Sequence, residues 1–216
     1  MTLNEFAKEA YSPNDIHNEF FDSLYSGQDT QLVGCRQSGK STALAIYMAY
    51  HLITNTREDA RTIMFSSWNS SVGKQTFELT AKFLREYEER RGMSGSAPWA
   101  NNRKVQITMA NGNNIEYFDS TSSGCLRGVR DIRTIILDEP NPQRLSPQLF
   151  YTIQQLDTQI VLVGKRPTST KGFKFNFYSL PWHECGKDGG AVVGGRILLS
   201  EQEFHSQYER LTPYSN

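Results

Sequence analysis

The stretch Gly34-Cys35-Arg36-Gln37-Ser38-Gly39-Lys40-Ser41 decides the fold, because it fits the pattern G-x-x-x-x-G-K-[ST] of a phosphate-binding loop. Its glycines let the backbone curl so that successive N–H groups point at phosphate oxygens. The helix that follows directs the positive end of its dipole at the same anion. We therefore expect the whole loop, together with the next residue, Thr42, to bind a nucleotide.

The sequence on either side of the loop supplies the context that this motif requires. Residues 30–33 form a short strand-like run, and residues 42–52 form an apolar helical segment without Pro or Gly. Within the loop, Lys40 is expected to reach the β- and γ-phosphates, and the Ser41 hydroxyl is expected to bind Mg²⁺. ATP and Mg²⁺ are the ligands that we predict.

Composition restricts the possible functions. The chain has 216 residues, 38% of them hydrophobic, which suits one α/β domain with a sizeable core. Lys+Arg and Asp+Glu number 23 each, so the chain is not a globally basic nucleic-acid coat. Its 3 cysteines are widely spaced and odd in number, which indicates a reducing compartment. No stretch has the apolar length of a membrane span or the pattern of a signal peptide.

Beyond the loop, apolar strand-like runs alternate with helical patterns. Strands are predicted at 62–66, 134–137 and 160–163, and helices at 70–91 and 146–157. Asn111-Gly112 separates alternating runs at 104–109 and 114–118, which predicts a hairpin. Strands that alternate with helices imply parallel pairing with right-handed crossovers. We predict an α/β fold, a P-loop NTPase of the RecA/ASCE-like type, with a central, mostly parallel sheet flanked by helices.

The two ends of the chain differ from this core. Residues 1–25 carry helical signals, and residues 92–102 read as a Gly/Ser/Asn-rich loop. Residues 164–195 are rich in Gly, Pro, Lys and Ser, and a last helix is predicted at 201–211. We assign residues 1–170 to the ATPase core and residues 171–216 to a small C-terminal lid subdomain.

A second nucleotide motif is present in Ile135-Ile136-Leu137-Asp138-Glu139, an apolar strand that ends in two acids. Because the carboxyl ends of parallel strands share one edge, both carboxylates should lie beside the phosphate loop. We expect Asp138 to support Mg²⁺ and Glu139 to polarise the attacking water. The glutamate favours hydrolysis over nucleotide binding alone.

Phosphoryl transfer also requires positive charge at the γ-phosphate as the transition state forms. The candidates are Arg36, inside the loop, and Arg127 and Arg130, which precede the acidic strand. Spacing alone does not choose among these three arginines.

Taken together, these motifs resemble the ATPase domain of the large terminase subunits of tailed phages. The arginine-containing loop is followed, in that family's order, by Ile115-Glu116-Tyr117-Phe118, Leu126-Arg127-Gly128 and Asp138-Glu139. The resemblance covers most of the chain. Its more specific part is the Arg36-Gln37 pair in the loop together with Leu126-Arg127-Gly128.

The resemblance implies an ATP-driven motor that translocates double-stranded viral DNA into a capsid in the host cytoplasm. Its implied partners are the DNA, the capsid portal, the small terminase subunit and further copies of the chain in a homo-oligomeric ring, expected to be a pentamer, with the isolated chain a monomer. Carried over by motif, Lys40 and Ser41 bind phosphate and Mg²⁺, and Asp138 supports the metal. Glu139 is the catalytic carboxylate, Arg127 acts across the subunit interface, and Arg36 is the loop arginine.

Two features depart from the family pattern. The family has a glutamine near the N-terminal helix that reads adenine, and here Asn14 or His17 occupies that neighbourhood. These two residues are therefore the nucleotide-binding candidates there, and the choice of base stays open. A Ser/Thr-rich coupling motif is expected at 164–170, where the pattern is irregular and the coupling residue is ambiguous.

Large terminases also continue into a nuclease domain with clustered acids. The acids after Glu139 are few and scattered, so we expect an isolated ATPase domain or fragment without a nuclease. Two alternatives remain. A helicase-type DNA-dependent ATPase needs a second RecA-like domain, for which the chain is too short, and a non-hydrolysing nucleotide-dependent assembly module does not need Glu139.

Overall fold

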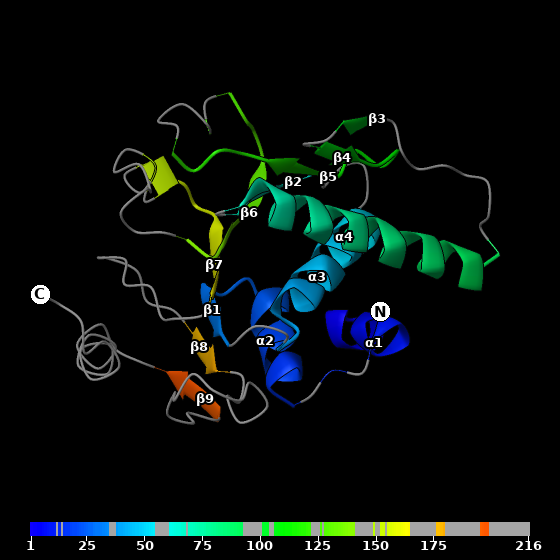
Figure 1. Cartoon of the computed structure of the whole chain (residues 1–216), viewed down its shortest axis with the longest axis horizontal. Coiled ribbons are helices and arrows are strands. Elements are labelled where there is room, and N and C mark those ends of the chain that lie inside the picture. The colour runs from blue at the N-terminus through cyan, green and yellow to red at the C-terminus, as the bar shows by residue number, and fades with distance from the viewer. Residues whose placement is uncertain are drawn as a thin grey trace, which may run out of the picture.

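One central sheet organises the chain. The structure is a computed structural model that describes residues 1–11, 13, 15–34, 38–54, 61–67, 69–92, 101–103, 106–121, 126, 128–140, 149, 152–153, 155–164, 176–179 and 195–198. The strands are β1 (Thr30–Val33), β2 (Thr62–Ser67), β3 (Asn101–Arg103), β4 (Gln106–Thr108), β5 (Asn114–Tyr117), β6 (Ile132–Asp138), β7 (Gln159–Gly164), β8 (Asn176–Ser179) and β9 (Gly195–Leu198). These described strands form a nine-stranded sheet in the order β3-β4-β5-β2-β6-β7-β1-β8-β9 (Figure 1).

The middle of this sheet is parallel. Strands β5, β2, β6, β7, β1 and β8 pair in parallel, whereas β3 and β4 on one side and β9 on the other pair antiparallel. Every residue of β2 and of β7 is buried, as expected for strands covered on both faces. The predicted α/β fold with a mostly parallel sheet is confirmed.

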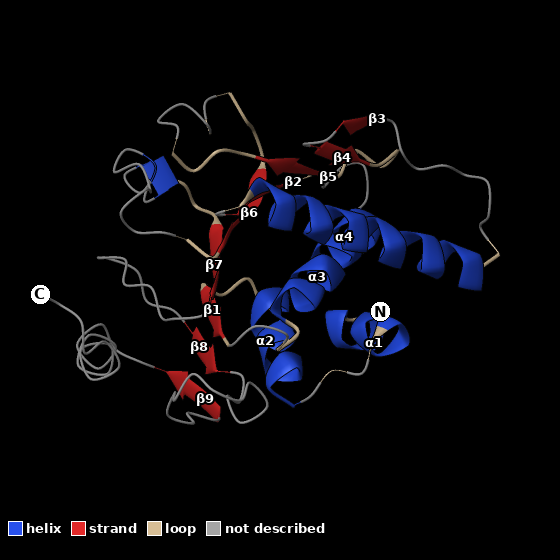
Figure 2. Cartoon of the chain, viewed as in Figure 1, coloured by secondary structure: helices blue, strands red, loops and turns tan. Residues whose placement is uncertain are grey.

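Four helices cover one face of the described sheet: α1 (Leu3–Ala10), α2 (Asp15–Tyr25), α3 (Lys40–Thr54) and α4 (Ser70–Arg90) (Figure 2). The helix α3 is buried along most of its length, because it lies under α1, α2 and α4 and over the sheet. This position explains its continuous apolar sequence. On the opposite face, Leu149 and Ile153, from the helix predicted at 146–157, pack against Ile135 and Leu137 of β6.

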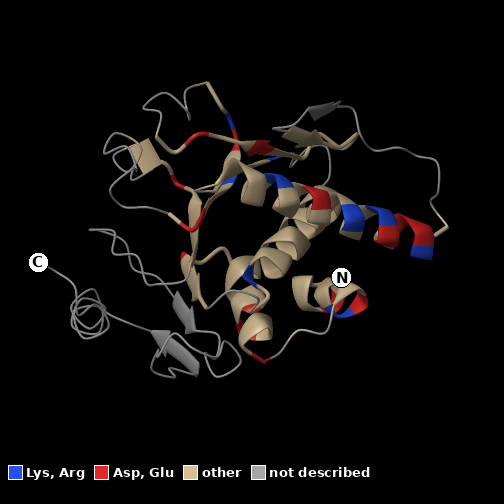
Figure 3. Ribbon diagram, in the orientation of Figure 1, with Lys and Arg blue, Asp and Glu red and all other residues tan. Residues whose placement is uncertain are grey.

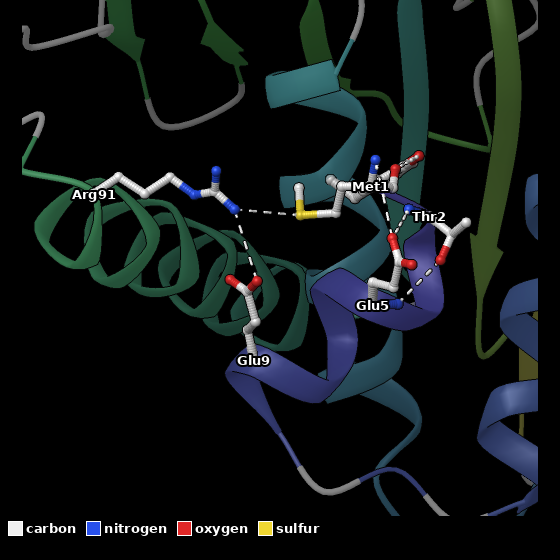
Figure 4. A network of polar contacts seen from close by, with 6 residues as sticks. Met1, Thr2, Glu5, Glu9 and Arg91 are labelled. Atoms are coloured by element: carbon white, nitrogen blue, oxygen red, sulfur yellow. Dashed lines mark hydrogen bonds and ion pairs between the residues drawn. The ribbon is translucent and has the colours of Figure 1, made fainter.

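The N-terminal helix α1 is fastened to the end of α4 (Figure 4). A capping box between Thr2 and Glu5 begins α1. At its other end, Glu9 forms an ion pair with Arg91 at 3.7 Å, and the Arg91 guanidinium also donates to the Met1 sulfur at 3.7 Å. These contacts hold α1 at the end of α4, and α1 also packs against α3, the helix that follows the phosphate loop.

The exposed face of α4 carries both signs of charge. Ion pairs at i,i+4 spacing join Lys74 to Glu78, at 3.5 Å, and Lys82 to Glu86, at 3.7 Å. Basic and acidic residues alternate along the helix (Figure 3). This helix therefore does not present a basic stripe of the kind that binds nucleic acid.

The predicted hairpin is confirmed, since β4 and β5 pair antiparallel and Gly112 has a φ of 90°. Its tip also binds the end of α3: the side-chain amides of Asn111 and Asn113 donate to the Leu52 carbonyl at 3.0 and 3.4 Å. The strand β3, in contrast, begins within the predicted loop at 92–102. Antiparallel pairing with β4 gives these residues backbone partners that composition alone does not reveal.

Strands β8 and β9 come from the segment assigned to the lid. The strand β8 pairs in parallel with β1, and β9 pairs antiparallel with β8, so both continue the central sheet. The predicted boundary at residue 170 and the helix predicted at 201–211 lie outside the described residues. The lid therefore stays a prediction. Among the described helices, none combines the length and the apolar character that crossing a bilayer requires.

Candidate active site

The phosphate loop leaves the sheet at the carboxyl end of β1. The Gly34 N–H donates to the Gly164 carbonyl of β7 at 3.0 Å, which continues the strand pairing one residue past Val33. The chain re-enters regular structure at Lys40, the first residue of α3. The strand–loop–helix order predicted for the motif is therefore present, although Cys35, Arg36 and Gln37 lie outside the described residues.

The Lys40 side chain reaches back to Gly34, the first residue of the phosphate loop. Its ammonium donates to the Gly34 carbonyl at 2.6 Å, and the side chain is only 7% exposed. A buried ammonium needs hydrogen-bond acceptors, because it loses its hydration shell on burial. Without nucleotide, the backbone of the loop supplies one such acceptor. A nucleotide phosphate can take this place, since it offers charged oxygens to the same ammonium.

A side chain at Gly39 would be strained by the backbone conformation and by close neighbours. The φ of Gly39 is 87°, and a Cβ there would lie 3.0 Å from the Tyr11 hydroxyl and 3.1 Å from Nε2 of His17. The two rings meet edge to face, with centroids 5.9 Å apart. Burial lowers the pKa of His17, and a hydrogen bond with the Ser38 backbone opposes this effect. His17, predicted as a nucleotide-binding residue, therefore lies against the turn of the phosphate loop.

The acidic motif lies at the carboxyl end of β6. Asp138 is the last residue of the strand and is 2% exposed, and Glu139 follows it, half-buried. Glu139 has a φ of 51°, a left-handed conformation that is uncommon for a residue other than Gly, Asn or Asp. Its N–H donates to the Val163 carbonyl at 2.6 Å. This bond fixes the backbone from which the Glu139 carboxylate projects.

Strand β7 brings the two motifs together. It pairs with β1 on one side and with β6 on the other. Its consecutive residues Val163 and Gly164 accept from Glu139 and from Gly34, respectively. The phosphate loop and the acidic motif thus leave the same edge of the sheet from strands that have one strand between them. This is the crevice at which open α/β sheets bind ligands.

The buried position of Asp138 and its charged neighbours shift its pKa. Burial raises the pKa of Asp138 to about 7, the negative charge of Glu139 adds to the rise, and the Lys40 ammonium opposes it. The Oδ2 atom of Asp138 is buried and has no hydrogen-bond partner among the described residues. Such a buried carboxylate oxygen can bind a cation, or accept a hydrogen bond from a water, that arrives with the nucleotide.

Ser41 and Asp138 fit the predicted Mg²⁺ site. Ser41 is half-buried in the first turn of α3, and its hydroxyl is a ligand that Mg²⁺ accepts beside phosphate oxygens. Within the described ranges, no group of three or more His, Cys, Asp or Glu side chains could hold a metal. A site that shares its ligands with a nucleotide does not need such a group. Thr42, also predicted to bind nucleotide, follows Ser41 in the same turn.

The candidate arginines divide into two groups. Arg36 and Arg127, like Asn14 and residues 165–170 of the coupling region, lie outside the described residues, so their roles stay predictions. Arg130 is described and exposed, just before β6 begins at Ile132. A seven-residue strand spans about 20 Å, which exceeds the reach of a side chain. Arg130 therefore cannot reach the site at the opposite end of its own strand.

Several structures of phage proteins are similar to this chain. The large terminase ATPase domain of Thermus phage P74-26 superposes with a TM-score of 0.57 at 13% identity, over 97% of this chain and 92% of that one. An arginine-to-alanine mutant of the same domain gives 0.55 at 14% identity, over 95% and 88%. The large terminase of bacteriophage HK97 gives 0.50 at 13% identity, over 76% of this chain and 37% of that one.

At these identities the likeness establishes the fold. The chain has the fold of large terminase ATPase domains, and the predicted resemblance to them is confirmed at the level of the fold. No protein-family model matches the sequence, and no curated protein sequence matches it either.

Proposed function

We propose that this chain is the ATPase domain of a viral DNA-packaging motor, which hydrolyses MgATP at the carboxyl edge of its sheet. One observation carries the proposal: the backbone N–H groups of Gly34, the first residue of the phosphate loop, and of Glu139, the last residue of the acidic motif, donate to the adjacent carbonyls of Gly164 and Val163. The start of the phosphate loop and the acidic motif therefore share one edge of the sheet, which supports a common nucleotide site there. The fold shared with large terminase ATPase domains supports the same proposal.

Each side chain has a defined task in hydrolysis. Lys40 exchanges the Gly34 carbonyl for phosphate oxygens and balances the charge that develops on them. Glu139 accepts a hydrogen bond from the attacking water and takes its proton. The water oxygen then bonds to the γ-phosphorus while the bond to the β–γ bridging oxygen breaks, and ADP leaves with that electron pair. Mg²⁺, held by Ser41 and Asp138, would neutralise charge on the β- and γ-phosphates when bound.

A complete site also needs an arginine at the γ-phosphate, and we assign this role to Arg127 from a neighbouring subunit. Arg130 is too far from its own site to serve there. A guanidinium supplied by the next subunit in a ring makes turnover depend on assembly. Arg36 remains the second candidate, from within the loop.

Motor activity requires further partners. Because the net charge is zero and α4 carries both signs of charge, we expect DNA contact to depend on a local patch or on several subunits. The proposed partners are double-stranded DNA, the capsid portal, the small terminase subunit and other copies of the chain. The proposed setting is the host cytoplasm.

A phosphate-release assay tests this proposal. The purified chain is incubated with MgATP, with and without double-stranded DNA, over a range of protein concentrations. We expect slow turnover that rises with protein concentration, because each site is completed by a neighbour. Nucleotide binding without any phosphate release would instead identify an assembly module. High turnover that does not depend on protein concentration would contradict the shared site.

A further inference from the structure

The last residue of β2, Ser67, carries a buried hydroxyl. Ser67 is 6% exposed, and its Oγ atom has no hydrogen-bond partner among the described residues. A buried hydroxyl without a partner lowers stability relative to a methyl group of similar size. Such an atom is commonly matched by a water, an ion or a ligand.

The position of Ser67 points to the nucleotide site. It pairs with Asp138 in the parallel register of β2 and β6, where neighbouring strands lie about 4.8 Å apart. Paired residues of adjacent strands project to the same face of a sheet. Two buried oxygens without partners, Ser67 Oγ and Asp138 Oδ2, therefore lie on one face at the carboxyl edge. Strand β7 pairs with β6 and with β1, so this pair lies at the same edge of the sheet as the start of the phosphate loop.

The surroundings of Ser67 hold it in place. Its carbonyl accepts from the Tyr117 hydroxyl at 3.0 Å. The helix α4 passes so close that a Cβ on Gly73 would lie 3.4 Å from Cβ of Ser67 and 2.7 Å from the ring of Tyr117. The Tyr117 ring is in turn packed edge to face with Phe65 and Phe77. These contacts fix the backbone and the Cβ atom from which the Ser67 hydroxyl projects.

We propose that Ser67 is a positioning residue of this site, and that its hydroxyl and the Asp138 carboxylate together hold the hydrated Mg²⁺ of the bound nucleotide. Mg²⁺ usually keeps several of its waters, and each of these has two hydrogens to donate. Asp138 Oδ2 can accept one and Ser67 Oγ the other. Since the two oxygens are not bonded to each other, a water between them satisfies both. This inference rests on the proposed nucleotide-dependent function.

The test compares Ser67→Ala with the wild-type chain and with Ser66→Ala. Ser66 is also buried on β2, but it precedes Ser67 and therefore faces the opposite side of the sheet. Thermal unfolding is followed without ligand, with ADP and EDTA, and with ADP over a range of Mg²⁺ concentrations. Phosphate release is measured over the same Mg²⁺ range.

We expect Ser67→Ala to unfold at the wild-type temperature or higher without ligand, and to bind ADP normally in EDTA. The Mg²⁺ concentration that it requires should rise about tenfold, as is typical when a residue that orients the ligands of a metal is replaced. Ser66→Ala should keep the wild-type Mg²⁺ requirement. In an Asp138→Asn background, Ser67→Ala should have little further effect, because both residues act on the same waters.

Two results distinguish an error in the proposed function from an error in the role of Ser67. A wild-type chain whose ADP binding does not depend on Mg²⁺ would overturn the proposed function, and this inference with it. Wild-type binding that depends on Mg²⁺, with an unchanged requirement in Ser67→Ala, would overturn the role of Ser67 alone. A lower unfolding temperature of ligand-free Ser67→Ala would assign the hydroxyl to the fold instead.

Discussion

The backbone N–H of Glu139 donates to the carbonyl of Val163 at 2.6 Å, directly after β6 ends at Asp138. Glu139 adopts a φ of 51° there. A residue in the left-handed region at a strand end requires surrounding structure to hold it. The neighbouring strand β7 supplies that support and also accepts from Gly34, so one strand anchors the backbone at Glu139 and at the start of the phosphate loop.

Lys40→Ala should weaken nucleotide binding by about 10–100-fold, because it removes a charge-assisted hydrogen bond to the phosphates. The matched control is Lys74→Ala, on the exposed face of α4, where Lys74 pairs only with Glu78 at the surface. Equilibrium titration with an ATP analogue measures both variants. Equal affinities for the two variants would contradict the assignment of Lys40.

Asp138→Asn should change how stability depends on pH. In the folded chain the pKa of Asp138 is raised to about 7, and in the unfolded chain it returns to the ordinary value of 3.8. The folded state therefore holds a proton between these values that the unfolded state has lost. The free energy of unfolding contributed by this group is complete below pH 4 and falls as the pH rises toward 7. Asparagine does not ionise and does not lose this contribution.

Unfolding temperatures at pH 4.5 and pH 8 test this prediction. Asp138→Asn should be more stable than wild type at pH 8, by on the order of a few kcal/mol, and the advantage should shrink toward pH 4.5. Nucleotide binding by the same variant should require a higher Mg²⁺ concentration. A stability difference that does not change with pH would show that Asp138 is not a buried, protonated group near pH 7.

Gly73→Ala should destabilise the chain, although alanine is the better helix former by about 1 kcal/mol. The new Cβ would lie 2.7 Å from the Tyr117 ring, which Phe65 and Phe77 prevent from moving. Such overpacking costs about 1–3 kcal/mol. Urea unfolding of Gly73→Ala beside Lys74→Ala, an exposed neighbour in α4, measures the effect. A more stable Gly73→Ala would show that Tyr117 has room to shift.

Sequence patterns predicted most of the fold for identifiable reasons. The apolar runs that became β2, β6 and β7 are buried on both faces, and Gly112 fixed the hairpin. The adjacent placement of Gly34 and Glu139 followed from the rule that parallel strands share a carboxyl edge. The order of strands in the sheet could not be predicted in the same way, because the sequence does not show which strand lies between β1 and β6.

Other features depend on contacts between segments that are distant in the chain. Ser67 gives no signal in the sequence, since only its register with Asp138 brings it to the site. Tyr11 contacts Gly39 only because α1 and α2 fold over the loop. The N-cap of α4, Asn69, accepts from the Ser71 N–H at 2.9 Å and could have been recognised as an asparagine before a helical pattern.

Arg127 is tested by complementation between subunits. Arg127→Ala should leave nucleotide binding by the monomer unchanged and lower turnover in assembled rings by about 10³–10⁵-fold, as for other arginine fingers. Mixing Arg127→Ala subunits with Glu139→Gln subunits should restore part of the activity that neither variant has alone. Some interfaces in mixed rings pair an intact Glu139 with an intact Arg127. Mixed rings that assemble but stay inactive would contradict action across the interface.

The most direct test of hydrolysis at this site is phosphate release by Glu139→Gln, with ATP binding measured in the same samples. Glutamine has the size of glutamate and the same backbone preferences, so the hydrogen bond to Val163 should persist. It cannot take a proton from the attacking water. We predict ATP binding at the wild-type affinity and turnover lowered by about 10²–10⁴-fold. Phosphate release at the wild-type rate would contradict the catalytic role of Glu139 and the proposed active site.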